Sequence, residues 1–530
     1  MTEENEQIRR LPQGWIQLKL EDVADWGSGA TPSRKNADYF NGDIPWIKTG
    51  ELKSKYIFNT EEKITKEAVI ESSTKIFPKG SVAIAMYGAT IGKTSILNID
   101  AATNQACAVA KPLREILFNE FLYYYLSSQG RKFTELGKGG AQPNISQTIL
   151  KNYPIFLPPL SEQQHIVEKI EELFSDIDQG IESLKTAQKQ LKVYRQAVLK
   201  WAFEGKLTEE WRRDRFLYLK TGEALLAQIK TERENHYQQQ LAEWEAAVKK
   251  WEAKGKVGKK PTKPQKLKEL LPLTEAELSE LPQFPSCWHL EKLGNLSELV
   301  GGVTKGRDLK AQTTISLAYL RVANVQDGYL DLSLIKYIEV LPSELDKYRL
   351  IAGDVLYTEG GDKDKLGRGT VWQEEIKDCI HQNHVFRARL LSPSVIPDFI
   401  AYYSQTQTAK NYFFKRAKQT VNLASINMTI LSNLSIPIPS YLEQEQIVQE
   451  IELRLSICDQ LEATIVENLQ KAEALRQSIL KQAFEGKLVP QDPNDEPAEK
   501  LLERIKQEKI NQKAELKQNI TQLKIEGIPS

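Results

Sequence analysis

The segment Gly88–Thr94 (GATIGKT) comes closest to a catalytic phosphate-binding motif. A P-loop cradles phosphates with backbone N–H groups and needs four residues between its two glycines. Only three residues separate Gly88 from Gly92, so a nucleotide site is not expected, and Gly360–Arg368 in the second half fits no better. We expect a glycine-rich loop between strands with Lys93 at its tip. A basic loop of this kind can contact a phosphate backbone.

Cys379, His381 and His384 form the one cluster of Cys and His residues. Cys379 and His381 would lie on the same face of a strand, because side chains alternate between faces. A structural zinc site needs four ligands, and no fourth lies nearby in the sequence. We therefore expect no metal here, and instead residues of a sheet or of a polar binding surface.

Motifs of the common catalytic classes are missing from the sequence. It contains no Gly-x-Ser-x-Gly, His-Glu-x-x-His or Gly-x-Gly-x-x-Gly. An adenine methyltransferase would need an Asn/Asp-Pro-Pro-Tyr/Phe loop. Leu157–Leu160 (LPPL) lacks both flanking residues, and Asp492–Asn494 (DPN) lacks the second proline. We find no restriction-nuclease motif either, so the chain alone is expected to be non-catalytic.

Polar and basic loops are the remaining candidates for chemistry. Gly137–Asn144 (GKGGAQPN) and Lys415–Asn422 (KRAKQTVN) occupy matching places near the ends of the two halves. The pairs 104–105 (NQ) and 382–383 (QN) also correspond roughly. Arg, Lys, Asn and Gln are the side chains that pair with the edges of guanine and adenine. Each residue is a candidate for a base contact, and the alternative is an ordinary solvated loop.

The elements that would position these loops occur twice. Ala202–Leu207 (AFEGKL) returns unchanged as Ala483–Leu488, 281 positions later. A repeat of this length is too long for a solenoid unit. It indicates two copies of one domain followed by a helix, with similar scaffolds and different loops. A second set of matches, at an offset of 273, pairs Trp15 with Trp288, Gly29 with Gly302, Thr31 with Thr304 and Gly80 with Gly353.

Each copy is expected to be a mixed α/β (α+β) domain. Short apolar runs at Ile44–Ile47, Val82–Met86 and Cys107–Ala110 are separated by Gly, Pro and Asn, which is typical of strands. Phe118–Leu126 is expected to be a helix. The proline-rich stretch Tyr153–Pro159 is expected to be extended, because proline disfavours the helical region for the residue before it.

A long helix is expected after each domain, with Gly205 and Gly486 as the stops. Because the copies are equivalent, we expect the two helices to pair about a pseudo-twofold axis as an antiparallel coiled coil. The alternative is that each helix packs on its own domain. Apolar residues recur mostly at spacings of three and four, as in a coiled-coil seam. They are Ile166, Ile170, Leu173, Ile177, Ile181, Leu184, Leu191 and Val198, and Ile447, Ile451, Leu455, Cys458, Leu461, Ile465, Leu469, Ala472, Leu475 and Ile479.

Each long helix has a helical extension. Glu223–Lys230 (EALLAQIK) and Glu499–Lys506 (EKLLERIK) share one pattern. The stretch Lys254–Lys268 is rich in Lys, Gly and Pro, so we expect a mobile linker there.

Composition limits the class of protein. The 530 residues include 71 basic and 71 acidic ones. Residues 1–160 hold 19 basic and 17 acidic residues, and residues 283–440 hold 18 and 16, so each region is only +2. Any nucleic-acid binding must therefore rest on local patches. The sequence has no apolar run of about 18 residues. Its charged N-terminus is unlike a signal peptide, and its four scattered cysteines suit a reducing compartment, so a cytoplasmic protein is expected.

Several motifs flank the long helices or lie inside the two domains. They are Trp15 with Lys19 and Leu20, Ile44–Lys48 (IPWIK), Phe77–Gly80 (FPKG), Pro158–Gln163 (PPLSEQ), Ala202–Leu207, Leu317–Arg321 (LAYLR), Gly353–Leu356 (GDVL), Glu443 with Gln444, and Ala483–Leu488. With these motifs the chain resembles, over nearly its whole length, the specificity subunits of type I restriction-modification enzymes.

The resemblance implies two target recognition domains, each reading one half of a split DNA sequence, with the helices as the spacer between half-sites. It implies double-stranded DNA, two modification (methyltransferase) subunits and restriction (translocase/nuclease) subunits as partners. S-adenosylmethionine, ATP and Mg²⁺ are expected in those partner subunits, and no cofactor in this chain. By analogy, the two helical extensions are expected to dock modification subunits. The segment Thr208–Leu281, which holds the first of these extensions, is longer than a simple connection between repeats, and docking by its helix is the role that the analogy suggests.

The alternatives are a coiled-coil scaffold with two protein-binding heads and an orphan specificity subunit of a methylase-only system. The expected domains are 1–157 and 283–439 for target recognition, 158–207 and 440–488 for the spacer helices, 208–282 for a helical and basic linker, and 489–530 for a helical tail. The residues expected to contact DNA are Thr31, Lys48, Lys93, Asn104, Gln105, Lys138, Gln142 and Asn144 in the first copy, and Thr304, Lys305, Arg321, Lys363, Arg368, Gln382, Asn383, Lys418, Gln419 and Asn422 in the second.

Overall fold

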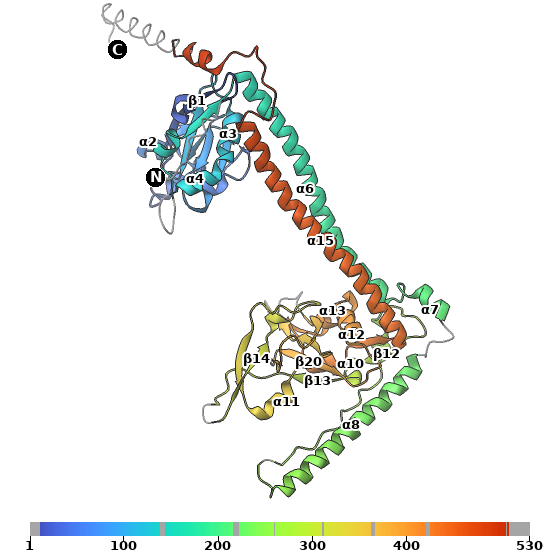
Figure 1. Ribbon diagram of the computed structural model, residues 1–530. Coiled ribbons are helices and arrows are strands. Elements are labelled where there is room, and N and C mark those ends of the chain that lie inside the picture. Colours follow the sequence, from blue (N-terminus) through green and yellow to red (C-terminus); the bar gives the residue numbers. More distant parts are fainter. Residues whose placement is uncertain are drawn as a thin grey trace, which may run out of the picture. The chain divides into compact units, whose positions relative to one another are not determined.

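The computed structural model describes residues 11–137, 144–215, 222–258, 260–309, 312–361, 366–419, 424–504 and 506–507. The chain divides into two compact units. Unit 1 comprises residues 1–185 and 466–530, and unit 2 comprises residues 186–465. Each unit holds one α/β domain together with a part of both long helices (Figure 1).

The domain of unit 1 contains a five-stranded sheet in the order β2-β10-β7-β8-β4 and a four-stranded sheet in the order β5-β3-β9-β6. The strand β7 is buried along its whole length, as its apolar run predicts. A separate antiparallel pair, β1-β11, joins the start of the domain to its end. The elements are β1 (Ile16–Lys19), α1 (Leu20–Val23), β2 (Ala24–Ser28), β3 (Ile44–Ile47), β4 (Tyr56–Ile57), β5 (Glu62–Ile64), α2 (Lys66–Glu71), β6 (Ile76–Phe77), β7 (Val82–Ala85), β8 (Thr94–Leu97), β9 (Ala101–Thr103), β10 (Cys107–Pro112), α3 (Asn119–Ser128), α4 (Gly130–Leu136), α5 (Gln147–Lys151) and β11 (Pro154–Leu157).

The domain of unit 2 repeats this topology. The sheet β13-β20-β16-β18 corresponds to β2-β10-β7-β8, and the sheet β15-β14-β19 corresponds to β5-β3-β9. Even the one parallel pair of the second sheet recurs, as β3 with β9 and as β14 with β19. The elements are β12 (His289–Lys292), α10 (Leu293–Leu296), β13 (Ser297–Gly301), β14 (Ile315–Leu320), β15 (Lys336–Val340), α11 (Leu345–Tyr348), β16 (Val355–Thr358), β17 (Gly360–Gly361), β18 (Gly369–Val371), β19 (Ile380–His381), β20 (Val385–Leu390), α12 (Pro397–Ser404), α13 (Gln407–Arg416), β21 (Lys418–Gln419), β22 (Ala424–Ser425), α14 (Met428–Ser432) and β23 (Ser435–Ile438).

The long helices are α6 (Leu160–Phe203) and α15 (Tyr441–Phe484), of 44 residues each. Each ends at a glycine with positive φ, +70° at Gly205 and +68° at Gly486. A Cβ at either position would lie 2.3 Å from a ring carbon of a proline, Pro285 or Pro12 respectively. Both the left-handed backbone and the close approach therefore require glycine.

A buried tryptophan–glutamate contact fixes the start of each long helix. The indole N–H of Trp15 donates to Glu162 Oε2 at 3.0 Å, and that of Trp288 donates to Glu443 Oε2 at 3.1 Å. Glu443 also accepts a hydrogen bond from Arg212 Nε at 2.7 Å. No described arginine or lysine pairs with Glu162, so the two copies differ in how this buried carboxylate is compensated.

The next residue of each helix, a glutamine, ties the helix to its domain. The side-chain amide of Gln163 donates to the carbonyl oxygens of Ile116 and Pro158 and accepts from the backbone N–H of Phe118. Gln444 makes the equivalent three hydrogen bonds in unit 2. The Glu-Gln pair of each motif therefore serves the junction between helix and domain.

The far end of each long helix packs on the domain of the other copy. In unit 1, the ring of Phe484 lies edge-on to Phe121 and Tyr125 of α3, with centroid distances of 5.3 and 5.2 Å. In unit 2, Phe203 packs on two rings of the equivalent helix α12 at 5.0 and 5.1 Å. The repeated AFEGKL motif therefore joins the end of one copy to the domain of the other. Packing of each helix on its own domain alone is excluded.

The two long helices run antiparallel in both units (Figure 1). In unit 1, Arg476 pairs with Asp178 and lies over the ring of Phe174 at 4.8 Å. In unit 2, Arg195 pairs with Asp459. The residue numbers of each ion pair add to 654, as 178 + 476 and 195 + 459. One antiparallel register therefore describes the pairing in both units, as the pseudo-twofold repeat predicts.

Two residues of the expected seam lie outside it. Leu461 and Leu475 are exposed, with 48% and 51% of their surface accessible. The neighbouring residues Glu462 and Arg476 face the partner helix instead and form ion pairs across it. A repeat of 3.6 residues per turn drifts against a strict spacing of threes and fours, which shifts these positions by one residue.

The helical extensions also repeat each other. The backbone N–H of Gly222 donates to Cys287 O at 3.0 Å in unit 2, and that of Ala498 donates to Gly14 O at 3.1 Å in unit 1. Leu225 and Ile229 of the first extension and Leu501 and Leu502 of the second are buried. Unit 2 contains α7 (Glu209–Arg215), α8 (Gly222–Ala253) and α9 (Glu275–Ser279).

In the described residues, the linker expected after α8 makes contacts with that helix. Residues 258 and 260–269 form no helix or strand, but they lie along α8 and are held by side chains of that helix. Their composition favours an extended chain, and aromatic side chains of α8 give that chain a surface to pack on.

None of the helices in the described part of the chain is long and apolar enough to cross a membrane.

Candidate nucleic-acid interface

Turns at one end of the two sheets lie next to one another in each domain. In unit 1, the backbone N–H of Ala30, which follows β2, donates to Thr103 O at 3.0 Å, and that of Asn104 donates to Ile47 O at 2.9 Å. These bonds bring the segment after β2, the segment after β3 and the turn between β9 and β10 to one place. That turn carries Asn104 and Gln105.

The glycine-rich loop joins the same end of the domain. The backbone N–H of Met86 donates to Ala106 O at 2.8 Å, and Ile145 N–H donates to Met86 O at 3.0 Å. An isolated bridge also links Tyr87 to Asn144. The loop after β7, which holds Lys93, therefore lies beside the β9–β10 turn and beside Asn144 and Ile145.

Unit 2 places its own turns by the same bonds. Val303 N–H donates to His381 O at 2.8 Å, and Gln382 N–H donates to Leu320 O at 2.9 Å. The backbone N–H of Glu359, the counterpart of Met86, donates to the carbonyl oxygen of His384 at 2.9 Å. The two domains thus present equivalent loop clusters with different side chains.

In each copy a glycine allows the loop after the first sheet strand to approach the neighbouring turn. A Cβ on Gly29 would lie 2.0 Å from Thr103 O, and a Cβ on Gly302 would lie 1.9 Å from His381 O. No side chain fits at either position. Gly29 and Gly302 are therefore required for the loop after β2, or after β13, to meet the neighbouring turn.

The expected DNA contacts of unit 1 divide into exposed and engaged residues. Lys93 is exposed and has no ion pair with a described carboxylate. Gln105 is exposed and its side chain is hydrogen-bonded to the hydroxyl of Thr31. Asn144 is exposed, whereas Asn104 is half-buried. Thr31 and Gln105 therefore meet at the β9–β10 turn, and the loop after β7 adjoins this turn through Met86 and adjoins Asn144 through Tyr87.

Lys48 is less available. Its ammonium group lies 3.0 Å from both Glu61 and Glu62, and these hydrogen bonds raise its pKa. Arg34 pairs with Glu62 at 2.7 Å and stacks on Phe40 at 4.2 Å. Two cations of this region therefore already have carboxylate partners, which leaves Lys93 as the better candidate for a phosphate.

The expected contacts of unit 2 divide in the same way. Thr304, Lys305 and Lys418 are exposed. Arg321 is half-buried and donates to Leu334 O at 2.9 Å, and Arg368 donates to the side chain of a glutamine. Gln382 and Asn383 are half-buried at the turn that matches residues 104–105. Lys138, Gln142, Lys363 and Asn422 lie outside the described residues, and of Gln419 only the backbone, in β21, is described.

The DNA contacts predicted from the sequence include no aromatic residue, although the structure exposes several aromatic rings. Tyr87, at the start of the glycine-rich loop, exposes 45% of its surface, and Tyr329 and Tyr337 of unit 2 expose more than half. Aromatic rings can stack on unpaired bases. A tyrosine directly before Gly88 was the signal available in the sequence.

Cys379 and His381 belong to the core. Both are fully buried at β19. Burial raises the pKa of Cys379 to about 12 and lowers that of His381 to about 4. The imidazole Nδ1 of His381 donates to Val385 O at 2.6 Å. Among the described residues, no three His, Cys, Asp or Glu side chains converge as a metal site would require. The sequence predicted either residues of a sheet or residues of a polar binding surface at this cluster. Cys379 and His381 are residues of the sheet core.

Two stretches of the chain, residues 12–187 and 285–471, match the family model described as type I restriction modification DNA specificity domain. Together they cover more than half of the chain and coincide with the two repeats. The chain belongs to this family. Its two specificity domains are the α/β domains of units 1 and 2 with the adjoining helices.

This chain is similar over nearly its whole length to the specificity subunits of two type I restriction enzymes. The specificity subunit of the type I restriction enzyme EcoKI from Escherichia coli K12 is 24% identical over 519 residues, which cover 94% of this chain and 96% of the relative. That of StySPI from Salmonella potsdam is 24% identical over 518 residues, with the same coverage. A solved chain from a study of type I R-M system assembly has a TM-score of 0.59 at 17% identity, covers 90% of this chain and 99% of its own length, and supports the fold.

Proposed function

We propose that this chain is the sequence-recognition subunit of a type I restriction-modification complex, in which each domain reads one half of a bipartite DNA target. The single observation that carries the proposal is the pair of equivalent loop clusters. The same backbone bonds place Asn104 and Gln105 in unit 1 and Gln382 and Asn383 in unit 2, and the amide order is inverted between them. Asn and Gln read adenine in the major groove. Equivalent scaffolds with unlike amides are what two unlike half-sites require.

The partners and cofactors follow from the family. The chain would bind two modification subunits, which would supply S-adenosylmethionine and the methyl transfer, and restriction subunits, which would supply ATP hydrolysis with Mg²⁺. The long helices would set the distance between half-sites. Exposed apolar residues on α15, including Leu453, Ile457 and Leu461, offer a surface for a modification subunit. A complex without restriction subunits would carry out methylation alone.

The test is an exchange of one domain. Residues 20–150, which lie between β1 and β11, are replaced by the matching segment of a relative with a different target, and methylated positions are mapped by sequencing. We expect one half of the target to change and the other half to persist. The matched control exchanges the loop-bearing part of unit 2 instead and should alter the other half. A change of both halves after a single exchange would contradict independent reading. Binding of a protein ligand with no DNA preference would favour the scaffold alternative.

A further inference from the structure

The proposed recognition function does not involve α8 or the segment that follows it in unit 2. Leu225 and Ile229 are the last residues of α8 with buried side chains. Glu232 and Arg233 still contact the domain, through Ser392 and Asn295. Beyond Arg233 the helix runs 20 further residues to Ala253, about 30 Å at about 1.5 Å per residue (Figure 1). The returning segment, residues 258 and 260–269, is called the strap, and the outer part of α8 together with the strap is called the basic arm.

Side chains of α8 at a spacing of seven residues hold the strap. The helix advances about 32 Å from the first of these side chains to the last, over 21 residues at about 1.5 Å each. The strap covers 11 residues between its matching positions, about 34 Å at the 3.1 Å per residue of a polyproline-like chain. The two lengths agree, so an extended strap can meet every second turn of the helix. The contacts are Trp251 Nε1 to Gly258 O (3.0 Å), Trp244 Nε1 to Pro261 O (3.0 Å), Lys266 over the ring of Tyr237 (5.9 Å) and Lys230 with Glu269 (3.1 Å).

Both ends of the arm are fixed. At the tip, Gly255 (φ +73°) and Lys256 (φ +61°) cap the helix, with Lys256 N–H donating to Trp251 O and Gly255 N–H to Glu252 O, both at 3.0 Å. This is the Schellman pattern that ends a helix and reverses the chain. At the base, Arg233 donates to the carbonyl oxygen of Leu267 at 2.8 Å.

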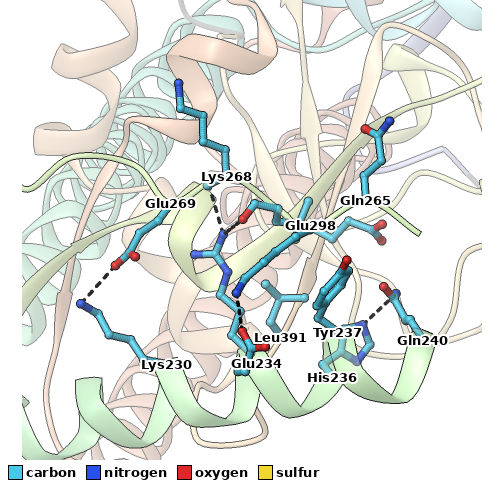
Figure 2. Close-up of a pocket in the computed structure, with 13 residues that line it drawn as sticks. Lys230, Glu234, His236, Tyr237, Gln240, Gln265, Lys268, Glu269, Glu298 and Leu391 are labelled. Carbon is cyan, nitrogen blue, oxygen red and sulfur yellow. Dashed lines mark hydrogen bonds and ion pairs between the residues drawn. The ribbon is translucent and has the colours of Figure 1, made fainter. Parts of the chain in front are cut away.

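Figure 2 shows the base of the arm, where the strap crosses toward the domain. A cavity of about 490 Å³ lies there, lined by α8, by the strap and by Glu298 and Leu391 of the domain. Lys230 reaches Glu269 across it, and His236 and Gln240 are hydrogen-bonded on the helix side. Charged side chains from both segments cross-link the base, so the arm is a built structure and not a loose loop.

The outer half of the arm is strongly basic. Residues 249–263 contain seven lysines and one glutamate, a net charge of 7 − 1 = +6, whereas each recognition region carries only +2. None of the described lysines in this stretch has an ion pair with a described carboxylate. Lysines near the end of a helix complement its dipole, which accounts for those on α8 but not for those on the strap. The exposed lysines are Lys249, Lys250, Lys254, Lys256, Lys260 and Lys263.

We propose that the basic arm binds the phosphate backbone of double-stranded DNA and adds affinity that does not depend on sequence. Protein interfaces are usually anchored by apolar or aromatic side chains. Here Trp244 and Trp251 are engaged by the strap, and Val257 is the one large apolar residue exposed at the described tip. Phosphate binding needs cations alone and gains from the release of counterions. DNA therefore fits this surface better than an acidic protein does.

The test neutralises the tip in the full-length chain. Lys254→Gln, Lys256→Gln and Lys260→Gln are combined, and binding to a 40-base-pair duplex of random sequence is measured over a range of salt. Each lost phosphate contact should reduce the salt slope by about 0.9. We expect the slope to fall by about 2 to 3 units and the affinity at 0.1 M salt to fall at least about tenfold. The matched control replaces the same three residues by Arg, which keeps the charge and should keep both values.

Two results would overturn the arm's role. One is an unchanged affinity and slope in the glutamine variant. The other is a loss confined to assembly with modification subunits, which would assign the arm to a protein. The proposal rests on DNA being the ligand of this chain, and the two can fail separately. The glutamine variant should still prefer its target duplex to the random one by the wild-type ratio, whereas a wild-type chain without that preference would contradict the proposed function and leave the arm's contact intact.

Discussion

Replacing Glu162 by Gln is expected to stabilise unit 1 above pH 7. Glu162 is 2% exposed, and its Oε1 has no hydrogen-bond partner in the described structure. Burial raises its pKa to about 7. Hydrogen bonds from Trp15 and Gln491 and the charge of His165 act in the opposite direction, and the charge of Asp495 raises the pKa further. The carboxylate is therefore held ionised at high pH at a cost in folding free energy.

The size of the effect follows from the pKa. A rise of the pKa from 4.5 to about 7, at about 1.4 kcal/mol per pKa unit, corresponds to at most about 3.5 kcal/mol. Because the folded pKa is raised, the folded chain binds more protons than the unfolded chain between pH 4.5 and 7. Stability from this group therefore decreases as pH rises through that window, and the loss is complete above pH 7. Glutamine does not titrate, so it removes the loss at pH 8 and changes little below pH 5.

The matched control is Glu443→Gln in unit 2. Glu443 accepts hydrogen bonds from Arg212 at 2.7 Å and from Thr208 at 2.8 Å. Removing its charge leaves a mostly buried guanidinium without its ion-pair partner, which costs about 3 kcal/mol. The same substitution is thus expected to stabilise one copy at pH 8 and to destabilise the other.

Hydrogen exchange is the assay, because the two units can open separately. Protection factors of the amides in β1 and β11 report on unit 1, and those in β12 and β23 report on unit 2, between pH 5.5 and 8.5. The Glu162→Gln variant should keep its protection in unit 1 as pH rises, while the wild type loses it. An identical pH dependence in the two proteins, or weaker protection of the variant at pH 8, would refute the reasoning.

Three further outcomes are expected. One heptad inserted in Ile166–Val198 together with one in Ile447–Ile479 keeps the seam and lengthens the paired helices by about 10 Å, roughly three base pairs; methylation sequencing should show a longer spacer or lost activity, and unchanged activity at the original spacing would exclude the helices as the ruler. Gln105→Ala should relax specificity at one base position by about 1–3 kcal/mol, whereas Lys93→Ala should weaken binding to all sequences and lower the salt slope by about one unit; titrations against single-base variants of the target separate the two. Phe484→Ala should destabilise unit 1 by about 3–5 kcal/mol, measured as lost amide protection in α3, and protection equal to the wild type would show that this ring does not hold the junction.

The repeat could be predicted from the sequence because identical residues make identical buried contacts. Trp15 and Trp288 each donate to a glutamate at the start of a long helix, and Gly29 and Gly302 each meet a carbonyl oxygen where no side chain fits. At the two glycines no side chain fits, and the two tryptophans make the same buried contact in both copies. Such positions remain recognisable in the sequence while the rest of the domain diverges.

Whether an individual charged side chain is free or paired with an opposite charge could not be predicted in the same way. Lys48 is a basic residue after a strand, which suggests a phosphate contact. Its neutralisation by Glu61 and Glu62 depends on the pairing of β3 with β5. Likewise, the composition of the segment after α8 does not reveal that Trp244 and Trp251 lie where the strap can bond to them. Both outcomes depend on contacts between segments separated in the sequence.

The loop clusters are held by main-chain hydrogen bonds, which explains how one scaffold can serve two unlike targets. The bonds from Ala30 to Thr103 and from Val303 to His381 join main chain to main chain. So do the bonds that position Asn104 and Gln382. A main-chain bond does not depend on the side chain that the residue carries. The residues at the candidate reading surface can therefore change type without loss of the backbone that presents them, whereas the helix junctions, which depend on side chains such as those of Trp15 and Gln163, cannot. This division places variation at the surface that would face DNA and constancy at the surface that holds the helices.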